Sequence, residues 1–490
     1  MPFGRTTRYM IATALVFTAA PPSGLTAAAT TSTASAISAR DKSEGAKAHP
    51  QLVAEYGGAI TGPQADYVAS IGKKVAQQSG LSNASSDFTV TLLDSSINNA
   101  FAIPGGYIYT TRQLVGLMNN EAELGGVLGH ETAHVALRHS AKRQSNSTKN
   151  QIVGVLGALL SGVVLGNSQV GQLLQKGFLQ GSQLLTLSFS RKQESEADTF
   201  GIKYLRAAGY DPRAMSSVLQ SLANQNALDS KLLGTSDQVP AWASTHPDPA
   251  SRVRTTAAQA GSSSTGVTNR DVFLSKIGGL IYGDSATQGF AEGRSFKHPI
   301  EKLAFEAPVG FYLVNGTQAV AIGGQSGKGQ FTTVAFDGNL DSYVAAQFAK
   351  LGQANQAQLN PSQIQRTTVN GIPAAYATAR VNSGSSPVDV TVFAYQWNNT
   401  QAYHFLTITQ AGQNPFDSMF GTMRRLTDAQ AAALKARRLQ VVTVKSGDTM
   451  QSLGSRMAYT DAPLERFLVL NGLTTSSRLS AGQKVKLVTY

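Results

Sequence analysis

The chain has 490 residues, of which 42% are hydrophobic and 14% charged, a composition that excludes a disordered chain and allows several domains with their own cores. It contains no cysteine, which excludes disulfides, thiolate metal ligands and a cysteine nucleophile, so any metal must be bound by histidine and carboxylate side chains. The formal charge is +12, and residues 435–490 hold nine basic and three acidic side chains; this basic end favours an anionic polymer or membrane surface as its neighbour, or is simply a solvated face.

Residues 1–29 have the pattern of a signal peptide for export. Basic residues precede an apolar run from Met10 to Ala20, and small residues follow before residue 30. An uncleaved membrane anchor is the alternative, but the run is shorter than the roughly 18 to 20 apolar residues that a span needs. Residues 30–48, rich in alanine, serine and threonine, are expected to form a flexible leader.

Residues 121–140 predict a helix, because alanine, leucine and glutamate dominate and apolar residues recur at three- and four-residue steps. His130 and His134 are four residues apart, so both imidazoles project from one helix face and can bind one zinc ion. Glu131 lies one step round the helix, beside the metal, where it can take a proton from a zinc-bound water. The pattern predicts one zinc ion per chain, with Glu131 as catalytic base.

An uncharged run starts at Ile152 and is followed by a second, largely apolar stretch, together spanning residues 152–187. Each stretch is short for a comfortable membrane span. We expect a helical hairpin that is either buried in the core or in peripheral contact with a membrane.

A third zinc ligand must come from elsewhere. His139 lies five residues past His134, about 140° round the same helix, so it is expected to face away from the metal, as a surface residue or a partner of a ligand. Residues 190–201 predict a second helix, on which Glu194 and Asp198 share a face. One carboxylate can complete the site and the other can accept the free ring N–H of a ligating histidine. Glu194 is the favoured ligand.

The second half of the chain predicts two further domains. Residues 261–269 are expected to be a linker, and residues 270–435 an α+β domain of unknown role, with helices at 340–352 and 427–438. His298 and His404 lie in this domain without partners at ligand spacing. The predicted strands are Phe311–Val314, Ala319–Ile322, Phe331–Phe336, Val388–Tyr395 and Tyr403–Thr409.

Residues 49–260 resemble the HtpX / CAAX prenyl protease-type family of gluzincin zinc endopeptidases, particularly its periplasmic bacterial branch. The resemblance is carried by His130-Glu131-x-x-His134, by Glu194-x-x-Ala197-Asp198, by the segment Asn99–Tyr107, and by Thr245-His246-Pro247 followed by Arg252. It implies that Glu194 is the third ligand and that Asp198 supports a ligating histidine.

The resemblance also implies a substrate site. Residues 100–110 would form an edge strand above the metal, and an extended polypeptide could bind there through Asn99, Ala100, Phe101 and Ala102. His246 and Arg252 would enter the active site as catalytic residues. His246 would either stabilise the developing oxyanion or cap the open metal position in a latent state; an ordinary polar loop residue is the alternative.

Residues 439–490 resemble a LysM module, through Val444–Thr449, Leu470–Leu473 and Ala481–Gln483. The resemblance implies a βααβ unit that binds glycans containing N-acetylglucosamine, which makes peptidoglycan the expected partner. A purely structural module is the alternative.

The expected fold class is α+β multidomain: a mainly helical gluzincin protease domain (49–260) with a small sheet and an active-site edge strand, an α+β middle domain, and a βααβ LysM-like C-terminal module. The expected function is that of a zinc metalloendopeptidase hydrolysing unfolded or misassembled cell-envelope proteins. It would act in the periplasm of a Gram-negative bacterium, associated with membrane or cell wall, without a nucleic-acid partner. The alternative is a peptidoglycan-tethered chaperone or assembly factor with a latent protease site; a peptidoglycan peptidase ranks last because its usual zinc motifs differ.

Overall fold

The computed structural model describes residues 35–140, 189–233, 246, 249–262, 266–355, 359–381 and 387–490. The predicted signal peptide (1–29), residues 30–34 and the apolar segment 152–187 lie outside the described residues. Within the described part of the chain, no helix is both long and apolar enough to span a bilayer.

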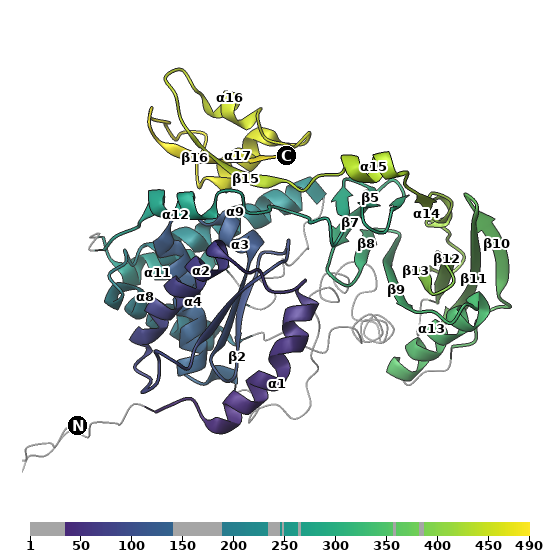
Figure 1. Cartoon of the computed structure of the whole chain (residues 1–490), viewed down its shortest axis with the longest axis horizontal. Coiled ribbons are helices and arrows are strands. Elements are labelled where there is room, and N and C mark those ends of the chain that lie inside the picture. Colours follow the sequence, from purple (N-terminus) through teal and green to yellow (C-terminus); the bar gives the residue numbers. More distant parts are fainter. Residues whose placement is uncertain are drawn as a thin grey trace, which may run out of the picture. The chain divides into compact units, whose positions relative to one another are not determined.

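The first region is organised around one buried helix. α4 (Glu121–Ala136) lies against α2, α8 and α9 (Figure 1). Its residues are buried from Glu121 through His134. The side chain of Asn120 caps its first turn by accepting the N–H of Glu123, a common role for asparagine. The other helices of this region are α1 (Ala39–Glu55), α2 (Pro63–Ala76), α3 (Arg112–Leu117), α8 (Arg191–Ala207), α9 (Ala214–Leu233) and α11 (Pro249–Ala260).

Glycines allow α4 and α8 to approach each other closely. A β-carbon on Gly201 would lie 3.0 Å from the backbone nitrogen of His130, and one on Gly129 would lie 3.3 Å from the carbonyl oxygen of Gly201. Larger residues at these positions would push the helices apart. The close approach places His130 beside the first turns of α8.

Part of the predicted leader is helical. α1 begins at Ala39, with Ser38 as its N-cap, so the expectation of a flexible segment through residue 48 is wrong from residue 39 onward. Its composition is polar, and the sequence pattern therefore did not indicate a packed helix. Tertiary contact decides it, because Gly45 packs so closely on the hairpin turn that an added β-carbon would lie 2.1 Å from the carbonyl oxygen of Pro104.

The small sheet has the strand order β1-β3-β2, with β1 (Thr89–Leu93) parallel and β2 (Ala100–Ile103) antiparallel to the central β3 (Tyr107–Thr111). The segment 100–110, predicted as one edge strand, is therefore a hairpin of two strands. Of these two, β2 lies at an edge of the sheet and β3 at its centre. The chain reverses through Gly105 and Gly106, whose φ values of 94° and 86° suit glycine.

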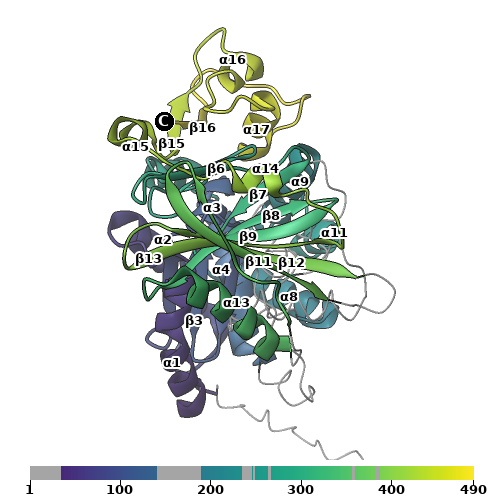
Figure 2. The same ribbon diagram turned by 90° about the vertical axis from the view of Figure 1, so that its right-hand side faces the viewer.

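The middle region contains a seven-stranded antiparallel sheet and a four-stranded sheet that share a core. α13 (Leu340–Asn355) covers one face of the larger sheet, over β11 and β12 (Figure 2). Aromatic residues such as Phe305, Phe331 and Phe405 fill the space between the two sheets. The strand orders are β10-β11-β12-β13-β9-β8-β7 and β14-β6-β5-β4. The strand bounds are β4 (Phe290–Glu292), β5 (Ser295–His298), β6 (Leu303–Glu306), β7 (Phe311–Asn315), β8 (Val320–Gly324), β9 (Gly327–Ala335), β10 (Gln365–Val369), β11 (Ile372–Val381), β12 (Val388–Gln396), β13 (Gln401–Gln410) and β14 (Arg424–Arg425).

All five strands predicted for this region are present within a few residues of their expected bounds. The helix predicted over 427–438 is shorter: α15 spans Asp428–Ala433, and β15 already begins at Arg438. The short helix α14 (Asp417–Phe420) was not predicted.

The C-terminal region has the expected βααβ order: β15 (Arg438–Thr443), α16 (Met450–Gly454), α17 (Pro463–Leu470) and β16 (Lys484–Thr489). Its core is continuous with that of the first region, because Leu453, Phe467 and Leu487 belong to the same buried cluster as α4. α12 (Arg270–Ile277) packs into this cluster as well. The middle domain was expected to begin at residue 270, but α12 belongs to the core of the first region instead.

Candidate metal centre

Two helices supply the side chains of the candidate centre. α4 presents His130 and His134, and the first turns of α8 present Glu194 and Asp198. α8 starts sharply at Ser190, whose side chain forms a reciprocal capping box with Gln193. This cap sets where the helix begins and hence where Glu194 lies.

Four side chains converge on one point. His130, His134, Glu194 and His246 each offer an atom that could bind a metal, and these atoms lie within 4.8 Å of one another. The Nε2 atoms of His130 and His134 are 3.0 Å apart, and each lies 3.5 Å from an oxygen of the Glu194 carboxylate. The structure thus brings together the three ligands predicted from the sequence and adds a fourth candidate.

Asp198 and Arg252 form an outer layer around these groups. Asp198 lies 3.0 Å from Nδ1 of His130, and this contact orients the ring so that Nε2 faces the cluster. The Arg252 guanidinium holds both carboxylates, with hydrogen bonds of 2.6 and 2.8 Å to Asp198 and an ion pair of 2.7 Å to Glu194. Arg252 therefore positions the acidic groups and does not point at an open substrate space.

The buried carboxylates of the site favour positive charge beside them, part of which Arg252 supplies. Although burial opposes the shift, the hydrogen bonds that His130 donates to the carboxylates of Asp198 and Glu194 raise its pKa to about 9. The pKa of Glu194 lies far below its usual range because the neighbouring imidazoles outweigh the effect of burial. Buried carboxylates of this kind need positive charge, from protons or from a divalent ion. Two imidazoles and a carboxylate are a donor set that zinc accepts, so the residues fit the metal.

Glu131 has the environment of a reactive carboxylate. It is fully buried, and among the described residues neither of its oxygens has a hydrogen-bond partner. Burial raises its pKa, with the nearby histidines opposing the shift. A buried carboxylate that accepts no hydrogen bond is costly to keep, and such groups occur at functional sites.

His246 enters the centre from a separate segment. Its Nδ1 lies 3.1 Å from a Glu194 oxygen, and its Nε2 lies 3.3 Å from the carbonyl oxygen of Ala100 and 3.4 Å from Glu131. The residue is completely buried. His246 thus connects the metal-ligand cluster with the free edge of β2.

His139 is not where a continuous helix would put it. α4 ends at Ala136, and Arg138 adopts a left-handed conformation with φ of 55°, so the chain turns back. His139 is buried, and its Nδ1 lies 2.9 Å from Nδ1 of His134. His139 lies outside the ligand cluster, and its contact with the outer nitrogen of His134 agrees with the predicted role as a partner of a ligand. The surface alternative is wrong, because the side chain is buried.

Sequence analysis missed Phe189, whose ring stacks on His134 with centroids 3.8 Å apart. No helical periodicity marks it, because it lies before the start of α8. Its position next to Ser190 is the only local signal.

The residues predicted to bind substrate differ in their surroundings. Asn99 is buried and its backbone bonds inward to Thr111, so it does not offer a free edge. Phe101 packs into a cluster with Leu52 and Phe189. Ala100 and Ala102 are buried within β2, and the carbonyl of Ala100 faces His246.

Comparison with known proteins assigns two segments. Residues 63–260 match the model of Peptidase family M48, and residues 442–488 match that of the LysM domain. Over 190 residues the chain is 34% identical to the beta-barrel assembly-enhancing protease of Yersinia pestis, covering 38% of this chain and 37% of the relative. It is 30% identical over 210 residues to the mitochondrial metalloendopeptidase OMA1 of Schizosaccharomyces pombe, covering 42% and 57%. It is 35% identical over 127 residues to metalloprotease LoiP of Escherichia coli, covering 26% and 47%. The chain thus covers between 37% and 57% of the length of these three relatives.

Proposed function

Residues 63–260 match the model of Peptidase family M48, and from this premise we propose that the chain is a zinc-dependent endopeptidase. His130, His134 and Glu194 would hold the metal, with one ion per chain, and Glu131 would be the catalytic base. The observation that carries the proposal is the buried carboxylate of Glu131, which accepts no hydrogen bond among the described residues and lies beside the converging ligand atoms.

The chemistry divides between the ion and the chain. When bound, zinc polarises a peptide carbonyl and makes water a stronger acid. Glu131 accepts the proton that the attacking water loses and returns it to the leaving amine. Its raised pKa suits both transfers, because a more basic carboxylate takes the proton from water more readily and keeps it until the amine leaves. Asp198 and Arg252 keep His130 and Glu194 oriented throughout.

The substrate is proposed to be an extended polypeptide. β2 lies at the edge of its sheet beside the ligand cluster, so its outer backbone groups can pair with a further strand. Backbone pairing reads little sequence, which fits unfolded or misassembled proteins better than one defined site. One of the similar proteins is named a beta-barrel assembly-enhancing protease, and this name supports cell-envelope proteins as the substrates.

We infer that the described arrangement is a resting state. His246 contacts the Ala100 carbonyl and the Glu194 carboxylate, and it thereby occupies space that a paired substrate would need. Substrate binding would displace His246, which corresponds to the capping role among the alternatives considered above. Export to the periplasm and contact with cell-wall glycan through residues 442–488 remain part of the proposal, supported by the LysM match.

The test compares wild type with Glu131→Gln. Both proteins are expected to bind one zinc ion per chain, measured by atomic emission after dialysis, because the substitution leaves the ligands intact. Casein hydrolysis should occur only with wild type, stop with a chelator and return with zinc. Glu306→Gln, which changes an exposed glutamate of the middle region, serves as the matched control. Zinc-free wild type, or a Glu131→Gln variant that cleaves casein normally, would refute the proposal.

A further inference from the structure

A small pocket adjoins the metal centre where β2 meets the hairpin turn. This hairpin-end pocket has a volume of about 40 Å³ and is lined by residues 35–38, by residues 102–105 and by the end of α4. His134, one of the candidate ligands, stands on its wall. Space of this size holds about three water-sized groups, which is close to the bulk of a small branched aliphatic side chain.

The pocket lies where a side chain of a paired substrate would fall. Ala100 and Ala102 face the core on the α4 side of β2, whereas Phe101 and Ile103 face α1. The carbonyl oxygen of Ala100 lies 3.3 Å from Nε2 of His246 in the ligand cluster, and the pocket begins two residues further along the strand, roughly 7 Å away. Because side chains of a strand alternate between its two faces, a substrate paired with β2 would turn every second side chain toward the α4 side.

The outer wall of the pocket is packed tightly against the hairpin turn. The side chain of Ser38 caps α1 by accepting the N–H of Asp41 at 3.0 Å. A β-carbon added to Gly106 would lie 2.9 Å from the side chain of Ile37, and one added to Gly105 would lie 2.8 Å from the carbonyl oxygen of Asp41. These contacts leave no room between wall and turn, so the pocket has a fixed width.

The lining favours an uncharged, apolar group. Ile37, Ala102 and Val135 provide apolar surface. The ionic groups of the lining are Asp41 and Arg138, which lie 3.5 Å apart as a pair, and the Arg138 side chain is 60% exposed. A charged substrate side chain would therefore lose its hydration here without meeting an unpaired opposite charge in the described lining.

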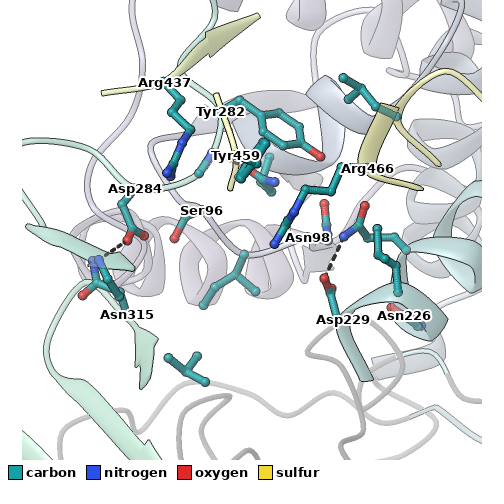
Figure 3. Close-up of a pocket in the computed structure, with 18 of the residues that line it drawn as sticks. Ser96, Asn98, Asn226, Asp229, Tyr282, Asp284, Asn315, Arg437, Tyr459 and Arg466 are labelled. Carbon is teal, nitrogen blue, oxygen red and sulfur yellow. Dashed lines mark hydrogen bonds between the residues drawn. The ribbon is translucent and has the colours of Figure 1, made fainter. Parts of the chain in front are cut away.

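A larger cavity, of about 360 Å³, lies between the 96–98 segment, α9 and the C-terminal region (Figure 3). Its charged groups have partners within the chain: Asp284 accepts a hydrogen bond from the amide of Asn315, and Arg466 lies 2.7 Å from Asp461. None of the four residues of the ligand cluster lines this cavity. A substrate held at the metal centre therefore meets the hairpin-end pocket and not the larger cavity.

We propose that the hairpin-end pocket is a subsite that takes a small aliphatic side chain, such as that of valine, about two to four residues from the peptide bond that is cleaved. The inference rests on the proposed function and gives it a sequence preference, which backbone pairing with β2 alone does not supply. Residues 35–38 thereby take part in substrate selection, although they lie outside the segment 63–260 that matches the peptidase model.

The experiment incubates the zinc-loaded, full-length protein with a library of short unstructured peptides, and mass spectrometry locates the bonds that are cleaved. Valine or alanine should be enriched at one fixed position two to four residues from the bond. Peptides that differ only at this position then give kcat/KM. Phenylalanine in place of valine should lower kcat/KM by at least about tenfold, because the pocket is too small for an aromatic ring.

Ile37→Ala removes part of the outer wall and should widen the pocket. The ratio of kcat/KM for the valine peptide to that for the phenylalanine peptide should fall at least about threefold. This ratio does not depend on the fraction of protein that is active, so partial misfolding does not imitate the effect. Leu81→Ala, in another wall, should act in the same way. Ile364→Ala, at a partly buried isoleucine of the middle region, is the matched control and should keep the wild-type ratio.

Two kinds of failure are distinguishable. Cleavage without a preference at these positions, a preference for charged or aromatic side chains there, or a wild-type ratio in both pocket variants would overturn the subsite and leave the proposed function intact. Absence of cleavage by the zinc-loaded wild type would overturn both.

Discussion

The side-chain nitrogen of Lys486 lies 2.6 Å from the carbonyl oxygen of Met118, 368 residues earlier in the chain. It also donates to the carbonyls of Gly116 and Leu117, at 2.8 and 3.1 Å, so one ammonium group satisfies the end of α3. Cations are favoured at this end of a helix. Burial lowers the pKa of Lys486, while the carboxylate of Glu123 favours its charged form. From Met118 the chain continues to Asn120, the N-cap of α4. By holding the end of α3, Lys486 of the C-terminal module therefore supports the helix that carries His130.

Replacing Lys486 should destabilise the whole first region. Lys486→Met would leave the buried carbonyls of Gly116 and Met118 without a donor, whereas that of Leu117 keeps the Asn119 amide. We expect a loss of about 2 to 4 kcal/mol in the free energy of unfolding. Urea titration of the full chain measures it. Lys484→Met is the control: its side chain forms a partly exposed pair with Asp271, and its loss should cost no more than about 0.5 kcal/mol. Equal stability of the two variants would contradict this role.

Asp198→Asn should weaken metal binding without removing a ligand. The amide keeps one accepting oxygen but loses the charge and the second acceptor, so it cannot serve both His130 and Arg252 as the carboxylate does. Losses of roughly 10- to 100-fold in zinc affinity are typical for such partners. Competition with a chromophoric chelator gives the affinity, and Asp66→Asn, at an exposed position on α2, should match wild type. An unchanged affinity for the Asp198 variant would show that the contact is incidental.

His246→Ala should increase peptide hydrolysis if this histidine caps the site at rest. The substitution removes the group that contacts both the Ala100 carbonyl and Glu194. Initial rates on an unfolded substrate, normalised to bound zinc, provide the measurement. A loss of turnover at full zinc occupancy would instead indicate that His246 stabilises the transition state, and an unchanged rate would exclude both roles.

Asp229 should make stability depend on pH. Its pKa is raised from 3.8 to about 6 by burial, so the folded state binds a proton more tightly than the unfolded chain does. The free energy of unfolding must then fall as pH rises from about 4 to above 6. Asp229→Asn removes this titration, and we expect it to gain about 1 to 2 kcal/mol on wild type between pH 4.5 and 7.5.

Urea midpoints at the two pH values test this expectation. Asp417→Asn, which changes an exposed aspartate, should not alter the pH profile. If the Asp229 variant follows the wild-type profile at both pH values, Asp229 is not the group responsible.

Several features were predictable because their signals are local. The i, i+4 spacing of His130 and His134 needs only helical geometry, and a capped helix with Glu194 and Asp198 on one face is visible in the sequence. Strand-like runs bounded by turn residues located five of the seven strands of the larger middle sheet for the same reason, but β10 and β11 were not predicted. The turn at Arg138 was not predictable, because a non-glycine residue in the left-handed region is held there by its surroundings.

The sequence by itself determined the donor chemistry: no cysteine, two histidines one helical turn apart, and a separate helix with two carboxylates. Only the tertiary structure decided that His246 meets them, that His139 turns back, and that the C-terminal module shares the first region's core. The reason is that these contacts join residues far apart in the chain. Their energies depend on packing and on the burial of charge, which no local pattern records.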